Sequence, residues 1–243
     1  MGAAAAASED PLAATIERAR AERLHEDRFW RVLVHYRGDL SRSKSEADGA
    51  AFFLAPGGKK NPQAELEATV RAFAEPVAGP APAIGDRPPQ DPRDEHPQCR
   101  FPARYRWLKE RLHFEAEIAE VPCPMYEEWR TQTAVGSATM IFAASQINAP
   151  ASMYGHTFLR LDRAGTAPGS TLLSTSVSYA ANQWTQNPLF YTVLGLTGGF
   201  QGRFQVLPYF IKIQQYSNVD SRDLWEYRLR LDDSQIDWVM RHL

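Results

Sequence analysis

The chain has 243 residues, 44% of them hydrophobic, which suffices for one large domain or for a main domain with a smaller one. Its 27 lysines and arginines against 29 acids give a formal net charge of −2, which argues against nucleic acid as a partner. No window approaches 18 consecutive apolar residues, so no membrane-spanning segment is predicted.

The N-terminal part is predicted to be helical. Residues 11–38 carry apolar residues at helical spacing, with a break expected near residues 24–27 and the end at Gly38. After a loop-like segment, Leu66, Val70 and Phe73 follow at i, i+4 and i+7 and predict another helix. Residues 11–74 are therefore expected to form an accessory helical segment.

A proline-rich segment, residues 75–97, is predicted to be a linker and marks the most probable domain boundary, with a second domain over residues 98–243. Directly after it, Arg100, Arg104 and Arg106 lie among aromatic residues. We expect a solvated face with arginines stacked on the rings, in preference to a phosphate or lipid-headgroup site.

From residue 138 onward the pattern changes to strands. The predicted strands are residues 138–145, 154–162, 171–179, 200–207 and 224–231. The first three are expected to pair as an antiparallel meander. An aromatic loop or short helix is expected over residues 183–199, and a helix capped by Asp232 or Asp233 over the last residues. Because the apolar face of that helix continues up to Leu243, the chain is expected to be a truncated fragment.

The most informative strand begins at a histidine. Turn-forming residues lead into Gly155 and His156, and alternation then places side chains on two faces. One face carries Tyr154, His156, Phe158 and Arg160, and the other carries Leu159 and Leu161. The leucine face is expected to be core and the histidine face half open. A glycine beside an imidazole also leaves room for a second chain or a substrate.

Cys99 and Cys123 are the only cysteines, and neither has metal-ligand spacing, so no zinc site, other metal site or cofactor is predicted. Their spacing leaves a disulfide and two buried thiols as equal alternatives. A disulfide would stabilise the fold by about 3 kcal/mol and would require an oxidising compartment. The common nucleophile, phosphate-loop and dinucleotide motifs are absent.

Several runs of sequence together resemble one family. They are Trp30-Arg-Val-Leu-Val-His-Tyr36, Phe52-Phe-Leu, Cys99-Arg-Phe-Pro-Ala-Arg-Tyr105, Asn148-Ala-Pro-Ala-Ser-Met-Tyr-Gly-His-Thr-Phe-Leu-Arg-Leu161 and Tyr216-Ser-Asn-Val-Asp-Ser-Arg-Asp-Leu-Trp-Glu-Tyr227. These runs are similar to those of the Lnb N-terminal periplasmic domain family. The resemblance extends from about residue 20 to the end, and the run around His156 is its most specific part.

The resemblance implies a periplasmic α+β domain with the antiparallel sheet of a permuted papain-like fold, as in NlpC-type peptidases and lecithin retinol acyltransferase. It implies that this fold is incomplete at the C-terminus here. The first ten residues lack the basic region and the leucine-rich core of a secretion signal, so we expect either a cytoplasmic protein or one whose signal has been removed or mis-annotated. His156 matches the catalytic base. The family's nucleophile lies in an Asn-Cys motif downstream of a helix like residues 232–243, beyond this chain. The resemblance also favours a structural disulfide between Cys99 and Cys123.

The implied function is thiol-dependent N-acylation of bacterial lipoproteins, with membrane phospholipid and lipoprotein as partners and membrane association through a segment absent from this chain. The alternatives are a non-catalytic cell-envelope binding or assembly module and an inactive fragment. Ser152, Tyr154, Gly155 and Arg160 are the candidate groove residues around His156. For the third catalytic residue, Ser174, Ser176, Asn182 and a residue beyond the chain all stay open. The chain by itself is expected to be inactive, because neither of its cysteines is a candidate nucleophile.

Overall fold

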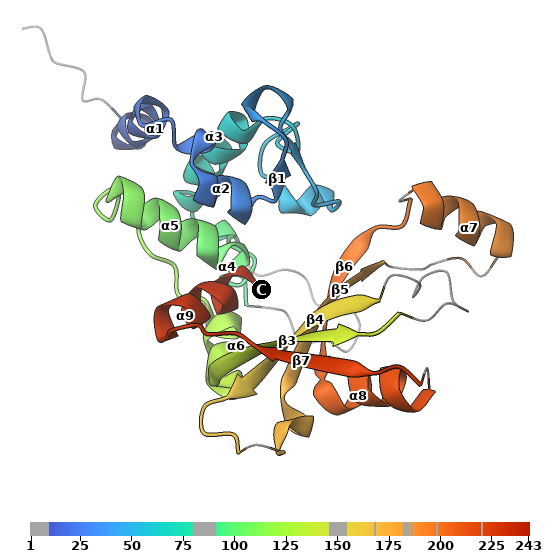
Figure 1. Ribbon diagram of the computed structural model, residues 1–243. Coiled ribbons are helices and arrows are strands. Elements are labelled where there is room, and N and C mark those ends of the chain that lie inside the picture. Colours follow the sequence, from blue (N-terminus) through green and yellow to red (C-terminus); the bar gives the residue numbers. More distant parts are fainter. Residues whose placement is uncertain are drawn as a thin grey trace, which may run out of the picture. The chain divides into compact units, whose positions relative to one another are not determined.

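The computed structural model describes residues 10–79, 91–145, 155–167, 169–181, 185, 187–197, 199–219 and 221–243. The chain divides into two compact units, one of residues 1–128 with 241–243 and one of residues 129–240. Figure 1 shows that the first is mainly helical, whereas a sheet forms the centre of the second. The predicted α+β class with an antiparallel sheet is therefore confirmed.

Short helices build the first unit. They are α1 (Pro11–Ala21), α2 (Arg28–Leu33), α3 (Pro62–Phe73), α4 (Pro97–Arg100) and α5 (Pro102–Leu112). Two short strands, β1 (Tyr36–Arg37) and β2 (Lys44–Ser45), pair between α2 and α3. The expected break in the helical segment 11–38 is confirmed, because a 3₁₀ turn lies at Leu24–Glu26, but the second helix ends at Leu33 rather than at Gly38.

The sequence explains the start and the buried face of α3. The Asn61 side chain accepts a hydrogen bond from the Ala64 N–H at 3.0 Å, which satisfies one of the free amides of the first turn. Leu66, Val70 and Phe73 are all buried, so the predicted helix is confirmed.

The expectation of a solvated arginine face is wrong for Arg104. Its side chain is buried and forms an ion pair with the buried Glu65, with 2.9 Å between Nη1 and Oε1. Arg104 Nη2 also donates to the Phe52 carbonyl oxygen at 3.0 Å. Glu65 in turn accepts from the Leu54 and Ala55 amides. These bonds replace the water that both charges lose on burial.

A disulfide joins Cys99 in α4 to Cys123, and their Cα atoms are 5.2 Å apart. The buried Gln98 beside it donates to the carbonyl oxygens of Phe73 and Ala119 at 2.8 and 2.9 Å. Residues on both sides of the proline-rich segment, residues 75–97, therefore lie in one compact unit. The assignment of a separate accessory domain before that segment stays a prediction.

Five antiparallel strands form the sheet of the second unit. They are β3 (Val135–Ala143), β4 (His156–Arg163), β5 (Thr175–Ala181), β6 (Gly202–Pro208) and β7 (Leu224–Arg228). Their order in the sheet is β6-β5-β4-β3-β7. The expected meander of β3, β4 and β5 is confirmed, and the final strand returns to pair with the free edge of β3.

Four helices accompany these strands. They are α6 (Pro124–Thr133), α7 (Pro188–Thr197), α8 (Tyr209–Ile213) and α9 (Asp233–His242). The short helix expected within residues 183–199 is α7, and the expected C-terminal helix is α9, with Asp232 accepting from the Gln235 amide. Neither α8 nor the π-helical turn after it, Gln214–Val219, was expected from the sequence pattern. Within the described ranges, no helix has both the length and the hydropathy needed to cross a bilayer.

The burial of β4 differs from the expectation. Phe158 and Arg160, on the histidine face, are buried. On the opposite face Leu161 is buried as expected, whereas Leu159 is only half-buried. The reason is α8 with the turn after it, because Tyr209 and Tyr216 from these elements pack on the histidine face. That face is therefore the main core face of the sheet, and the prediction that it is half open is wrong.

Candidate active site

His156 is the first residue of β4 and lies opposite Ala143, the last residue of β3. Gly155 before it has a φ of +79°, a conformation that favours glycine. A Cβ at Gly155 would lie 2.7 Å from the Phe142 ring and 2.9 Å from the Ala143 carbonyl oxygen. The space beside Gly155 is thus filled by β3, and the glycine is required by its backbone geometry.

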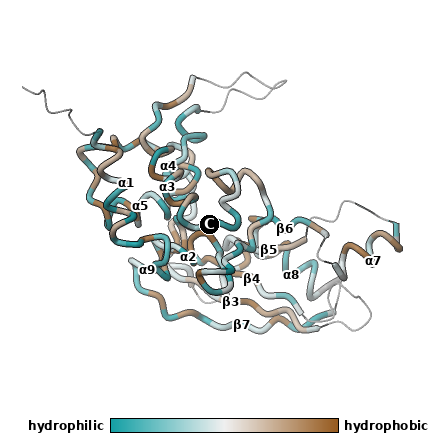
Figure 2. Tube along the Cα trace, turned by 90° about the horizontal axis from the view of Figure 1, so that it is seen from above, coloured by the Kyte–Doolittle hydropathy of each residue, from teal (hydrophilic) through white to brown (hydrophobic). Residues whose placement is uncertain are grey.

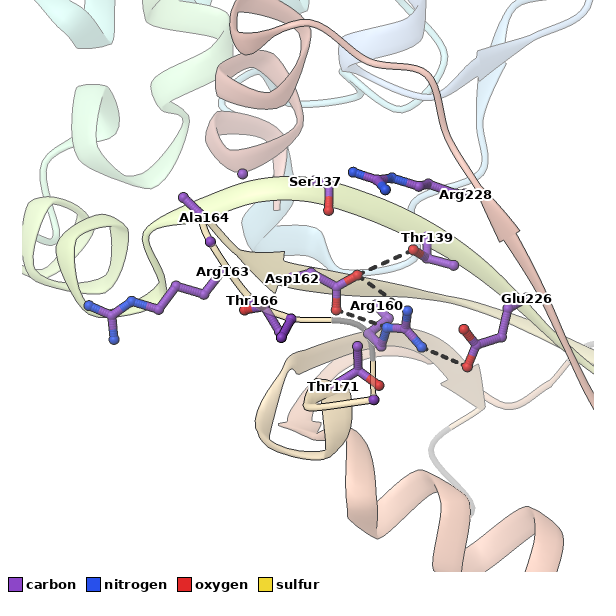
Figure 3. Close-up of a pocket in the computed structure, with 14 residues that line it drawn as sticks. Ser137, Thr139, Arg160, Asp162, Arg163, Ala164, Thr166, Thr171, Glu226 and Arg228 are labelled. Carbon is purple, nitrogen blue, oxygen red and sulfur yellow. Dashed lines mark hydrogen bonds and ion pairs between the residues drawn. The ribbon is translucent and has the colours of Figure 1, made fainter.

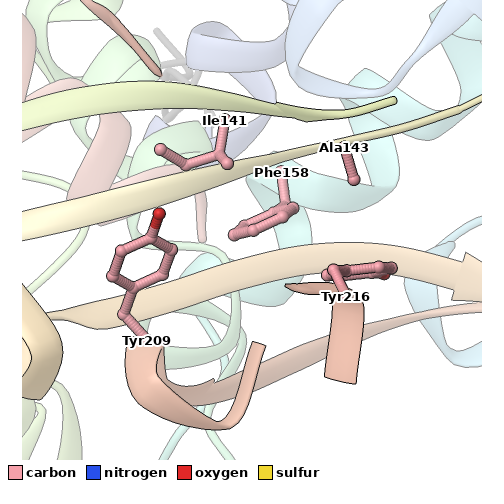
Figure 4. Close-up of a cluster of buried hydrophobic side chains, with 5 residues drawn as sticks. All are labelled: Ile141, Ala143, Phe158, Tyr209 and Tyr216. Carbon is pink, nitrogen blue, oxygen red and sulfur yellow. The ribbon is translucent and has the colours of Figure 1, made fainter. Parts of the chain in front are cut away.

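Aromatic rings surround the imidazole. The ring centroids of Phe158 and Tyr216 lie 6.2 and 6.0 Å from that of His156, both in stacked orientation. Figure 4 shows Phe158 and Tyr216 with Tyr209, Ile141 and Ala143 in the buried cluster under the sheet. His156 therefore lies at the end of the core, held by rings on its flanks.

The His156 side chain is half-buried, yet its Nε2 atom is buried and has no hydrogen-bond partner in the described part of the chain. A buried polar atom without a partner costs free energy, and such atoms mark places where another group is accommodated. An imidazole fully enclosed by this chain, with no opening next to it, would contradict a catalytic role. The His156 side chain is half-buried and is therefore not fully enclosed by the described residues.

Electrostatics favour the neutral imidazole. Burial lowers the pKa of His156 below its usual value, and the charges of Lys212 and Arg222 lower it further. Arg222 donates to the carbonyl oxygens of Ala144 and Ala143 at 2.6 and 3.1 Å, and its guanidinium lies 4.9 Å from the Tyr216 ring centroid. His156 is consequently a base at neutral pH rather than a cation.

Lys212, on α8, is almost wholly buried at 2% exposure. Among the described residues no carboxylate pairs with it, and its ammonium donates to Gln205 Oε1 at 3.4 Å. Opposite Gln205 in the sheet lies Ser178, whose buried hydroxyl has no partner in the same part of the chain. The face that carries His156 thus also carries a buried cation and a free hydroxyl.

Of the residues proposed for a third catalytic role, the two that the structure describes have hydrogen-bond partners other than His156. Ser174 donates to Asp162 Oδ1 and Ser176 to the Leu207 carbonyl oxygen, both at 2.7 Å. Asn182 lies outside the described residues, as do the groove candidates Ser152 and Tyr154.

Arg160 lies away from the imidazole, at a second polar site. It lies four residues along β4, roughly 13 Å at the usual rise of a strand. Its guanidinium binds Asp162 at 2.9 Å and Glu226 at 2.6 Å. Figure 3 shows these ion pairs at a cavity of about 430 Å³ near the far end of β4. The structure therefore separates Arg160 from His156, although both share one face.

Three neighbours of His156 were not predicted from the sequence, namely Lys212, Tyr216 and Arg222. Tyr216 and Arg222 belong to a run that carries the family resemblance, but nothing in the run shows which residue it approaches. Lys212 belongs to the short α8, which the sequence did not reveal. Within the described ranges, no group of His, Cys, Asp and Glu is arranged to hold a metal ion.

Two family models match the chain. The model of the Lnb N-terminal periplasmic domain matches residues 125–243, and that of a domain of unknown function (DUF7843) matches residues 22–111. No curated protein and no solved structure matches the chain. The first match contains the whole sheet and His156, and the second contains most of the first unit.

Proposed function

Because residues 125–243 belong to the Lnb N-terminal periplasmic domain family, we propose that they form the periplasmic part of a thiol-dependent acyltransferase that acts on bacterial lipoproteins. The base is His156. The observation that carries this proposal is its buried Nε2 atom, which has no partner in the described chain, on an imidazole kept neutral by its surroundings.

The chemistry requires a thiolate beside this base. Nε2 of His156 takes the proton of a cysteine thiol, and the thiolate attacks an ester carbonyl of a phospholipid. The imidazolium protonates the leaving lysophospholipid, and a thioester remains. The α-amino group of a lipid-modified cysteine then attacks the thioester, forms the amide and releases the thiol.

Lys212 and Arg222 act on the charges that arise in these steps. Both disfavour the imidazolium and so keep His156 ready to accept a proton. The same positive charges favour a thiolate and the negative oxygen of the tetrahedral intermediate. Lys212 is suited to this role because it has no carboxylate partner among the described residues.

The nucleophile is not one of the two cysteines of this sequence, because Cys99 and Cys123 are joined in a disulfide. In this proposal it comes from the Asn-Cys motif that the family resemblance implies, in a segment outside these 243 residues, within a papain-like arrangement. Membrane phospholipid is the acyl donor and a lipoprotein the acceptor.

The test uses the protein with its downstream Asn-Cys segment and measures transfer of an acyl chain from phospholipid to a diacylated lipopeptide by mass spectrometry. We expect His156→Gln to lower the rate by about 10²-fold to 10⁴-fold, the usual contribution of general base catalysis. The matched variant His25→Gln, in the first unit, should retain the rate. Both variants should keep their melting temperatures within a few degrees.

Full activity of His156→Gln would contradict the assignment of the base. Turnover by the 243-residue chain alone that is lost in Cys99→Ser would show that the nucleophile is misplaced. If the extended protein transfers no acyl group, a non-catalytic envelope-binding module replaces the proposal.

A further inference from the structure

Helix α7 exposes an apolar surface at the end of the hairpin of β5 and β6. Leu189, Phe190 and Val193 are 72%, 59% and 49% exposed. They lie at i, i+1 and i+4, which places them on one side of the helix. Figure 2 shows α7 in the hydrophobic colours at the edge of the second unit.

The inner side of α7 is fixed to its own hairpin. The rings of Tyr191 and Phe200 are 5.6 Å apart, and the Gly199 amide donates to the Leu194 carbonyl oxygen at 2.7 Å. The Asn187 side chain accepts from the Leu189 amide at the start of the helix. The apolar side chains that face outward are therefore presented on an ordered helix.

The end of the hairpin exposes further apolar side chains. Tyr179 of β5 and Phe204 of β6 are cross-strand partners whose rings lie 5.0 Å apart, and both are about half exposed. Val206, two residues farther along the same side of β6, is 52% exposed. The apolar patch therefore consists of α7 and the adjoining end of the hairpin.

Charged residues are absent from the connection between β5 and β6. Residues 182–201 contain no Asp, Glu, Lys, Arg or His, although 23% of the chain is charged, and Arg203 in β6 is the first charged residue after them. The segment that connects β5 and β6 has Asn, Gln and Thr as its polar residues and includes Trp184 and Tyr191. Charged groups are costly below a bilayer's headgroups, whereas Trp and Tyr prefer the interface.

We propose that α7 and the hairpin end dock on a phospholipid bilayer, with Leu189, Phe190 and Val193 inserted among the lipid chains. At ten residues, α7 is too short to cross the bilayer, so its exposed side chains would enter the lipid from one side only. A protein partner is a poorer occupant, because protein interfaces use a polar and charged rim for orientation and specificity. This segment supplies no such rim.

Docking through α7 does not require the chemistry at His156, so vesicle binding and acyl transfer can be tested separately. Such docking places a membrane contact within the 243 residues themselves, in addition to any segment outside them. If the proposed acyl transfer holds, the contact brings the sheet to the surface that contains the phospholipid donor.

The experiment is flotation of the 243-residue chain with vesicles of phosphatidylcholine alone and of phosphatidylcholine mixed with phosphatidylglycerol. We expect binding to both, with little dependence on salt, because the inserted surface is uncharged. The double variant Leu189→Glu with Phe190→Glu should partition at least about tenfold more weakly.

Two controls make the result specific. Leu173→Glu introduces the same charge at an 83% exposed leucine outside α7 and should leave binding unchanged. Leu189→Lys with Phe190→Lys should weaken binding to neutral vesicles as the acidic variant does. Equal binding by wild type and the acidic variant would overturn the proposal. So would absence of vesicle binding, including the case where the wild type dimerises through α7 and the acidic variant is monomeric.

Discussion

At the scale of single residues, the sequence located His156 and its strand but not its environment. The resemblance indicated a base at this position, and alternation placed Phe158 on the same face. Lys212 and Arg222 come from segments more than 50 residues later, so only the fold brings them to the imidazole. Long-range contacts of this kind leave no local pattern that a single sequence could reveal.

Arg104 illustrates the same limit in the first unit. Arginine among aromatic residues is usually solvated, but here Glu65 and the Phe52 carbonyl oxygen replace water around the guanidinium. The ring centroids of Phe101 and Phe52 lie 4.1 and 4.4 Å from its Cζ. The stacking of Arg104 on aromatic rings was therefore predicted correctly. Its burial and its polar partners were not predicted.

His35 and His242 in the first unit carry a pH prediction. Their ring centroids are 5.1 Å apart, and burial lowers both pKa values, that of His242 to about 4. Each also lies near the Arg104 charge, which lowers the pKa further, whereas Glu46 raises that of His35. Protonation therefore favours the unfolded chain, whose histidines titrate near their ordinary value.

The neutral buried histidines contribute fully to the free energy of unfolding above about pH 6.5. For His242, about 3 kcal/mol of this contribution is lost as the pH falls from there through about 4. We expect the unfolding free energy from denaturant titration to fall between pH 6.5 and 4.5, and His242→Phe to reduce that fall. An identical fall in wild type and variant would contradict the assignment.

At the scale of elements, long periodic segments were predicted well and short ones were not. The strands of the meander and α3 have clear alternation or helical spacing, and each appears within a few residues of its expected bounds. In contrast, α8 has five residues and continues into a π-helical turn, so it is too short for periodicity to show. Missing α8 is why the histidine face was assigned the wrong burial.

The disulfide gives a prediction for the helices of the first unit. Cys99 and Cys123 are 24 residues apart, so their bond constrains a loop of that size in the unfolded chain. We expect Cys99→Ser with Cys123→Ser to lower the unfolding free energy by about 3 kcal/mol, measured by denaturant titration.

Reducing agent should lower the stability of the wild type by the same amount and leave the double variant unchanged. Equal stability of the wild type in oxidising and reducing buffer would show that the bond contributes nothing.

At the scale of the whole molecule, the sequence was sufficient for the family and the α+β class. The two family models lie one after the other, residues 22–111 and 125–243, and the compact units divide near the same place, at Glu128. The thiol partner of His156 could not be found in these residues, since both cysteines serve the disulfide. We therefore propose that His156 acts as a base for a nucleophile supplied from outside these 243 residues.

The most direct measurement of that claim is the pH dependence of thiol alkylation by iodoacetamide in the protein with its downstream Asn-Cys segment. If His156 accepts the thiol proton, the reactive cysteine should titrate well below the ordinary thiol pKa of about 8.5, and His156→Gln should return it to that value or above. A cysteine that titrates near 8.5 in the wild type, with a profile unchanged by His156→Gln, would contradict the account.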